Sequence, residues 1–270
     1  MRPVLNTGQL QSFQARVWPG TLAVKENMEM SEILTIIVLT GFAGACIPVG
    51  GVIASFEQIR PYWLEREFRH FLIAFGGGIL LGAVTVVLVP EGISSMDGSV
   101  FAIPVILAGG FTFFLIEKSL GLRRRESPQL LGMILDYVPE ALALGGLVAL
   151  GSPVAPLLAV LIGLQNLPEG FNAYREIENN NNNNSNKTLL SMGALVPLGP
   201  MAGLAGYFFL SDHEIILGAI MLFASGGVLY LIFQDIAPQS RLERHWAPPL
   251  GGVFGFCLAL IGEMLVKSIS

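Results

Sequence analysis

The stretch LQNLPEGFN at residues 164–172 decides how this sequence is to be interpreted. It lies inside a long apolar segment, yet it places Pro168 directly before Glu169. A second stretch upstream, LDYVPE at 135–140, ends in the same proline–acid pair. A helix interior normally excludes proline, which lacks an N–H donor, and a membrane interior normally excludes carboxylates. Two such pairs in neighbouring apolar segments therefore need a functional explanation.

The composition around these pairs is that of an integral membrane protein. Hydrophobic residues make up 53% of the chain and charged residues only 13%, whereas a soluble domain carries about 25% charged residues. A spanning helix needs about 20 mainly apolar residues. Aromatics are few and strand-like alternation is absent, so helices are favoured over a barrel. We predict an all-α integral membrane protein of eight transmembrane helices, at about 32–55, 71–90, 100–120, 129–150, 154–175, 189–210, 214–236 and 247–267.

Positive charge is distributed very unevenly among the connections between these segments. The connections at 56–70, 118–127, 175–188 and 237–246 hold eleven Lys and Arg residues together, whereas those at 91–99, 151–153 and 211–213 hold none. Lys and Arg gather in cytoplasmic loops. The pattern predicts a multi-pass protein of the cell membrane with both termini outside.

Two regions stand apart from the transmembrane domain, which we place at 31–270. Residues 1–30 lack a continuous apolar run, and we expect them to form a disordered N-terminal arm. The stretch at 178–187 contains an asparagine tract, which predicts a flexible loop. Cys46 and Cys257 both fall inside expected spans, where they are interpreted as packing residues and not as a disulfide.

The deep polar residues are spaced so that they converge. Asp136 and Glu140 are four residues apart, and so are Gln165 and Glu169, which places each pair on one face of its helix. The two helices are expected to be antiparallel, because only a short GSPV turn separates them. The four side chains then fall at similar depth, given a rise of about 1.5 Å per residue.

Nothing in the sequence offers these carboxylates a counter-charge at that depth. Each buried charge costs about 2.5–3.5 kcal/mol on insertion scales. The acids must therefore be protonated, hydrated or neutralised by a bound cation, and a divalent metal ion neutralises several at once. Pro139 and Pro168 also free the carbonyls of Leu135 and Leu164, which adds backbone oxygens to the predicted site.

The paired motifs resemble the signature of the ZIP (Zrt/Irt-like) family of metal transporters. That family has eight spans with both ends outside, and its fourth and fifth spans carry motifs of the form His-Asn-x-Pro-Glu-Gly. QNLPEG at 165–170 is a close match and DYVPEA at 136–141 a looser one; LVPEG at 88–92, VPLGP at 196–200 and GGVLYLIFQDIAP at 226–238 resemble parts of the second, sixth and seventh spans. The resemblance covers about residues 32–268.

The chain also departs from the family pattern. Asp136 stands where the family has a histidine in span 4, and Tyr137 where it has an asparagine; Val87 and Val196 replace the span-2 histidine and the span-6 acid. The resemblance implies a primary metal site of Asp136, Glu140, Gln165 and Glu169. Asn166 is the remnant of a second metal position, with a helix–helix hydrogen bond as the alternative role.

We therefore predict a ZIP-type transporter, not an enzyme, that moves zinc, iron or manganese toward the cytoplasm through a carboxylate site on helices 4 and 5. No prosthetic group is expected, since the metal is bound transiently as cargo. Its oxygen ligands suit hard ions such as Mn, while the family favours zinc. The expected partners are the metal ion and the lipid bilayer, and no nucleic-acid partner is expected. The sequence leaves open whether the protein forms a homodimer. The alternatives are an intramembrane hydrolase, for which no His-Glu-x-x-His motif exists, and a non-transporting membrane scaffold.

Overall fold

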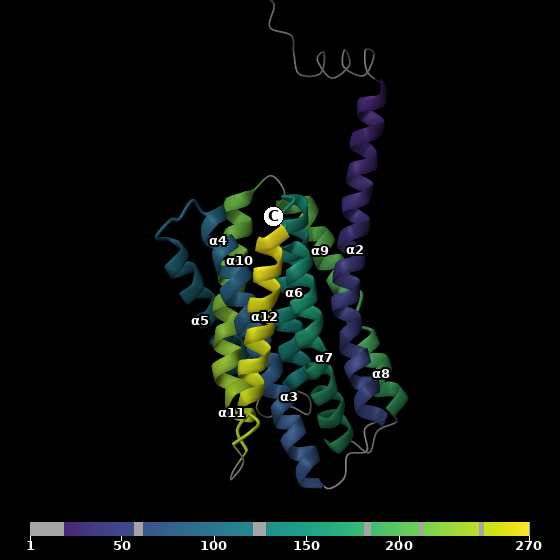
Figure 1. Cartoon of the computed structure of the whole chain (residues 1–270), viewed down its shortest axis with the longest axis vertical. Coiled ribbons are helices and arrows are strands. Elements are labelled where there is room, and N and C mark those ends of the chain that lie inside the picture. Colours follow the sequence, from purple (N-terminus) through teal and green to yellow (C-terminus); the bar gives the residue numbers. More distant parts are fainter. Residues whose placement is uncertain are drawn as a thin grey trace, which may run out of the picture. The chain divides into compact units, whose positions relative to one another are not determined.

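Helices account for all the regular elements in the part of the chain that the structure describes (Figure 1). The structure is a computed structural model, and it describes residues 19–56, 62–120, 128–180, 185–210, 213–242 and 246–269. In chain order the helices are α2 (Pro19–Phe56), α3 (Tyr62–Ala83), the π-helix η1 (Val84–Leu88), α4 (Val89–Ser95), α5 (Ala102–Leu120), α6 (Pro128–Ala149), α7 (Ala155–Asn180), α8 (Ser185–Gly193), α9 (Leu198–Leu210), α10 (Glu214–Leu231), the π-helix η3 (Ile232–Ile236), α11 (Ala237–Gln239) and α12 (Leu250–Ile269). The all-helical prediction is confirmed for these residues.

Seven helical segments among the described residues are long and apolar enough to cross a membrane. They mark the chain as a multi-pass membrane protein. The expected fifth span, α7, is not among them, although its 26 residues exceed the length that a span requires. Its interior carries Gln165, Asn166, Glu169 and Asn172, and its last turns are polar, so its composition alone does not qualify it.

The chain divides into two units at Thr35, and the site lies wholly within the second, residues 36–270. The first unit contains the beginning of α2, so Pro19 to Met30 of the expected arm are helical, while residues 1–18 lie outside the described part. Within the predicted loop at 178–187, α7 continues to Asn180 and α8 begins at Ser185. Residues 181–184 of that loop lie outside the described residues.

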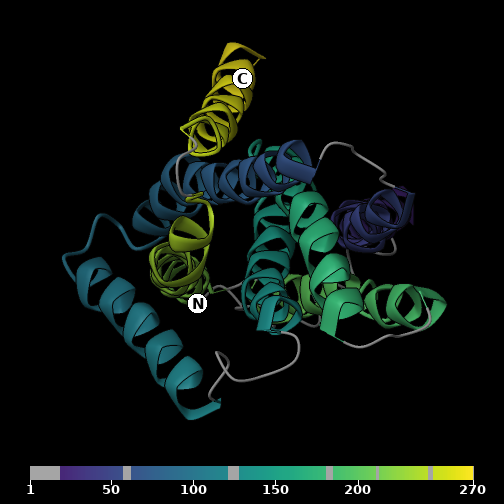
Figure 2. The same ribbon diagram turned by 90° about the horizontal axis from the view of Figure 1, so that it is seen from below.

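Helices α3, α6, α7 and α10 form the centre of the second unit, and other helices pack around them (Figure 2). Figure 2 shows α12 on the outer side of α3, and α5 on the outer side of α10. Helix α9 packs on α6, and α2 from Ile36 onward contacts α6, α7 and α9. The central helices are therefore covered, and α6 and α7 hold the deep polar residues.

Two of the central helices share a local irregularity. Just before Pro90, the Val89 N–H bonds the carbonyl of Val84, and just before Pro238, the Ala237 N–H bonds that of Ile232. Each bond reaches back five residues, which is the π-helical pattern and often marks a functional site. Figure 1 shows that α3 and α10 run in opposite directions, so the two π-helices lie toward opposite ends of the bundle.

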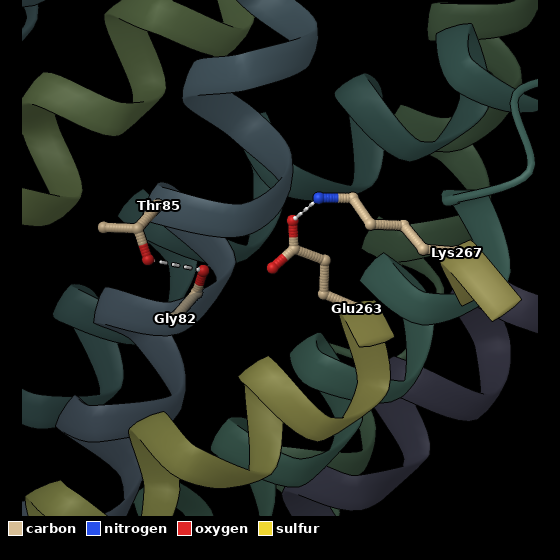
Figure 3. Close-up of polar contacts among 4 residues, drawn as sticks. All are labelled: Gly82, Thr85, Glu263 and Lys267. Atoms are coloured by element: carbon tan, nitrogen blue, oxygen red, sulfur yellow. Dashed lines mark hydrogen bonds and ion pairs between the residues drawn. The ribbon is translucent and has the colours of Figure 1, made fainter. Parts of the chain in front are cut away.

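The α3–α12 contact depends on close backbone approach. A Cβ atom on Gly78 would overlap the carbonyl oxygen of Gly252 in α12. The two polar contacts drawn in Figure 3 each join residues three or four positions apart in the sequence. There Lys267 Nζ lies 2.6 Å from Glu263 Oε1, and Thr85 Oγ1 donates to the Gly82 carbonyl at 3.1 Å.

Candidate functional site

Helices α6 and α7 are joined by a tight turn that fixes how their polar faces meet. Gly151 has φ +64°, a left-handed conformation that glycine adopts without strain. Around it, Gly151 N bonds the Val148 carbonyl at 2.9 Å and Ser152 N bonds the Leu147 carbonyl at 2.9 Å. This pair of bonds is a Schellman motif, which ends α6 and lets α7 start at once in the opposite direction.

Both helices continue through their prolines. Pro139 lies inside α6 and Pro168 inside α7, so each missing N–H is accommodated without ending the helix. The glycine after the second proline–acid pair has a packing role. A Cβ atom on Gly170 would overlap the carbonyl oxygen of Ile47, so α2 approaches α7 closely at this point. The segment 168–170 thus combines a proline without an N–H donor, an acid and a glycine at a close helix contact.

The strongest link between the two motifs is a hydrogen bond from Gln165 to Glu140. Gln165 Nε2 donates to Glu140 Oε2 at 2.7 Å, and both side chains are fully buried. The second carboxylate oxygen of Glu140, Oε1, and the amide oxygen of Gln165, Oε1, are buried and have no hydrogen-bond partner in the protein. The structure therefore brings these two predicted site residues into direct contact.

Asp136 and Glu169 line one cavity of about 70 Å³. Asp136 is 4% exposed, and its Oδ1 accepts a hydrogen bond from Tyr137 N at 2.7 Å. Glu169 Oε2 is buried without a hydrogen-bond partner in the protein. Among the described residues that line the cavity there is no Lys, Arg or His to balance these acids.

Asn166 lies against a neighbouring helix. Its Nδ2 donates to the carbonyl of Ala43 in α2 at 2.9 Å, which is the helix–helix hydrogen bond named above as its alternative role. Tyr137 makes a parallel contact, since its hydroxyl donates to the Thr40 carbonyl at 2.9 Å. Each motif thus donates one side-chain hydrogen bond to a backbone carbonyl of α2.

The cavity contains polar residues that the sequence reasoning missed. Asn172 of α7, Asp235 of η3 and Gln239 of α11 line it together with Asp136 and Glu169. Asn172 is seven residues after Gln165 and three after Glu169, so helical spacing could have identified it. Asp235 and Gln239 reach the cavity only because α10 and its extension pack beside α3 and α6.

The acids do not form a ready-made cage. Within the described residues, no group of three or more His, Cys, Asp or Glu side chains is placed to hold a metal ion. Three carboxylates, those of Asp136, Glu169 and Asp235, share the cavity with amides, and a fourth acid, Glu140, accepts a hydrogen bond from an amide. A cation at this site would therefore be held by carboxylate and amide oxygens in combination.

No protein-family model matches this chain, and no curated protein matches it in sequence. The resemblance to ZIP transporters therefore depends on the quoted motifs.

Proposed function

We propose that this protein transports divalent metal ions across the membrane toward the cytoplasm, through a site on α6 and α7 formed by Asp136, Glu140, Gln165 and Glu169. The observation that carries the proposal is a set of buried acceptor atoms on these helices without a donor from the protein. They are Glu140 Oε1, Gln165 Oε1, Asn166 Oδ1, Glu169 Oε2 and Asn172 Oδ1.

All five atoms are oxygens. Three of them belong to amide side chains whose nitrogens already donate hydrogen bonds to other groups. Gln165 donates to Glu140, Asn166 to Ala43 and Asn172 to Pro168. Buried acceptors are costly unless they are satisfied. The described residues that line the cavity of Asp136, Glu169 and Asn172 include no basic side chain. The acceptors there are best satisfied by a cation, because one divalent ion contacts several oxygens and offsets their charge.

The ZIP-type architecture is part of this proposal, including eight spans and both termini outside the cell membrane. Helix α7 would be the eighth span. Its polar residues are tolerable within a bilayer because α2, α3 and α6 shield them: Gln165, Asn166 and Asn172 are all no more than 2% exposed.

The paired π-helices support a transporter over a static scaffold. Helices α3 and α10 run in opposite directions, and each has one π-helix before a proline and one outer helix packed on it. Such an inverted relation between two halves is common in transporters, where the substrate site lies between them. Helix α7 contacts α3 and helix α6 contacts α10, and residues of all four helices or their extensions line the cavity.

Uptake into proteoliposomes tests the proposal. Vesicles that contain the purified protein should accumulate Zn²⁺, Fe²⁺ or Mn²⁺ faster than empty vesicles. Glu140→Ala and Glu169→Ala should each abolish this uptake while leaving the protein inserted. Ser225→Ala is a matched control, because Ser225 is buried in α10 and bonds only the Met221 carbonyl of its own helix among the contacts described, at 2.7 Å. Wild-type uptake by either inserted glutamate variant would overturn the assignment of the site.

A further inference from the structure

Asn172 lies one turn beyond the second proline–acid pair, at a position that neither quoted motif includes. It is 2% exposed and lines the cavity with Asp136 and Glu169. Its Nδ2 donates to the Pro168 carbonyl of its own helix at 2.8 Å. Its Oδ1 is buried and has no hydrogen-bond partner in the protein.

The orientation of the Asn172 amide follows from its bond. A carbonyl oxygen accepts hydrogen bonds only, so the amide nitrogen must be the atom beside Pro168. The oxygen is then the polar atom of this side chain that has no hydrogen-bond partner in the protein. An acceptor held in this way, in a cavity lined by three carboxylates, is suited to a positive charge and not to another acceptor.

The arrangement of the acids indicates why a neutral oxygen is needed. No three acidic side chains of the described residues are placed to hold a metal ion together. Hard divalent ions such as Mg²⁺ and Mn²⁺ favour six oxygen ligands, and Ca²⁺ takes six to eight. Asp136, Glu169 and Asp235 all line the cavity, but they are not placed to bind one ion together, so amide or water oxygens have to complete the shell.

We propose that Asn172 is a cargo-contacting residue whose Oδ1 binds the divalent ion in the cavity and favours hard cations such as Mn²⁺ over Zn²⁺. The proposal rests on the proposed transport function. It adds one residue to the site and defines a class of cargo, namely ions that prefer neutral and anionic oxygen ligands to imidazole or thiolate. Zinc, with its preference for four ligands of nitrogen or sulfur, gains less from an additional amide oxygen.

A purely structural role is the competing explanation, because Asn172 bonds its own helix. The two roles use different atoms of the same amide, so substitutions separate them. Asn172→Ala removes both atoms. Asn172→Asp keeps an oxygen for the cavity and adds charge, but it replaces the donor to Pro168 by an acceptor. Asn172→His offers the cavity a nitrogen ligand, which suits Zn²⁺ better than Mn²⁺.

The experiment measures Mn²⁺ and Zn²⁺ affinities of the purified full chain by equilibrium dialysis, for the wild type, these three variants and Ser225→Ala. We expect Asn172→Ala to weaken Mn²⁺ binding by about tenfold and Zn²⁺ binding by less, because one oxygen ligand is lost. Asn172→Asp should tighten Mn²⁺ binding, Asn172→His should reverse the preference toward Zn²⁺, and Ser225→Ala should change neither affinity.

Two results would overturn the role of Asn172: unchanged affinities in all three variants, or an equal loss for both metals throughout the series, which indicates a structural role. Failure of the transport proposal is distinguishable, since the wild-type chain would then bind neither metal. A wild-type chain that binds and transports metal beside an unaffected Asn172→Ala variant contradicts this inference alone.

Discussion

Glu140→Gln removes one charge from the site with almost no change in volume, and the structure predicts a larger effect than loss of charge alone. In the wild type, Gln165 Nε2 bonds Glu140 Oε2 at 2.7 Å, and Glu140 Oε1 has no partner in the protein. After substitution, the new amide must offer its oxygen to Gln165, which turns its nitrogen to the position of Oε1. If the Gln165 amide flips instead, its own nitrogen replaces its free oxygen. In either arrangement the cargo loses an oxygen ligand and meets an N–H donor.

The size of the effect follows from ligand loss. Outer-sphere substitutions at metal sites already cost about 10–100-fold in affinity, so loss of a direct carboxylate ligand, which costs more than loss of a neutral amide oxygen, should cost about 100-fold or more. A metal ion at 100 times its Kd stabilises the wild-type fold by about 2.7 kcal/mol. At the same concentration the variant would be stabilised by only about 0.4 kcal/mol, because that concentration would equal its Kd.

Unfolding of the purified protein in detergent, with and without Mn²⁺ or Zn²⁺, measures this difference. Without metal, Glu140→Gln should be at least as stable as the wild type, because it keeps the Gln165 contact and removes a buried carboxylate. With metal, the wild type should gain stability and the variant almost none. Equal stabilisation of both proteins by metal would refute the reasoning that Glu140 Oε1 faces the cargo.

Three further predictions concern other parts of the chain. Asp136→His replaces an anionic oxygen by a nitrogen, so uptake in mixed-metal competition should shift from Mn²⁺ toward Zn²⁺; an unchanged ratio would argue against direct ligation by Asp136. Tyr137→Phe removes the 2.9 Å bond to the Thr40 carbonyl and should lower the free energy of unfolding by about 1 kcal/mol while leaving metal selectivity intact; altered selectivity would place Tyr137 in the site. Replacing the asparagine tract 179–184 by a Gly/Ser connection should leave transport within about two-fold, since such a tract buries little surface; complete loss of transport would show that the tract is functional.

Local spacing in the sequence was sufficient to predict the helices and the pairing of the two motifs. The four-residue spacings place Asp136 with Glu140 and Gln165 with Glu169, and the short turn at Gly151 makes α6 and α7 neighbours. The contact between Gln165 and Glu140 follows from these features.

Features that depend on packing between distant segments could not be predicted in the same way. Asp235 lies more than 60 residues after either proline–acid pair in the sequence. It reaches the cavity because α10 packs beside α6 and η3 packs beside α3. The π-helices before Pro90 and Pro238 have backbone hydrogen bonds that reach back five residues instead of four, and a proline alone does not cause this change. Helix α7 does not qualify as a span by average hydropathy, because that average counts its polar residues without recording that they are buried.

X-ray absorption at the zinc and manganese edges tests the central claim most directly, because it identifies the atoms bound to the metal in the purified protein. The account predicts a first shell of oxygen atoms, at about 2.0–2.2 Å for zinc, without the sulfur shell near 2.3 Å and without the outer scattering of imidazole rings. In Glu140→Gln and Glu169→Ala this protein-derived shell should be lost. A shell that contains sulfur or imidazole, or one that is identical in both variants, would contradict a cation site formed by the oxygens of α6 and α7.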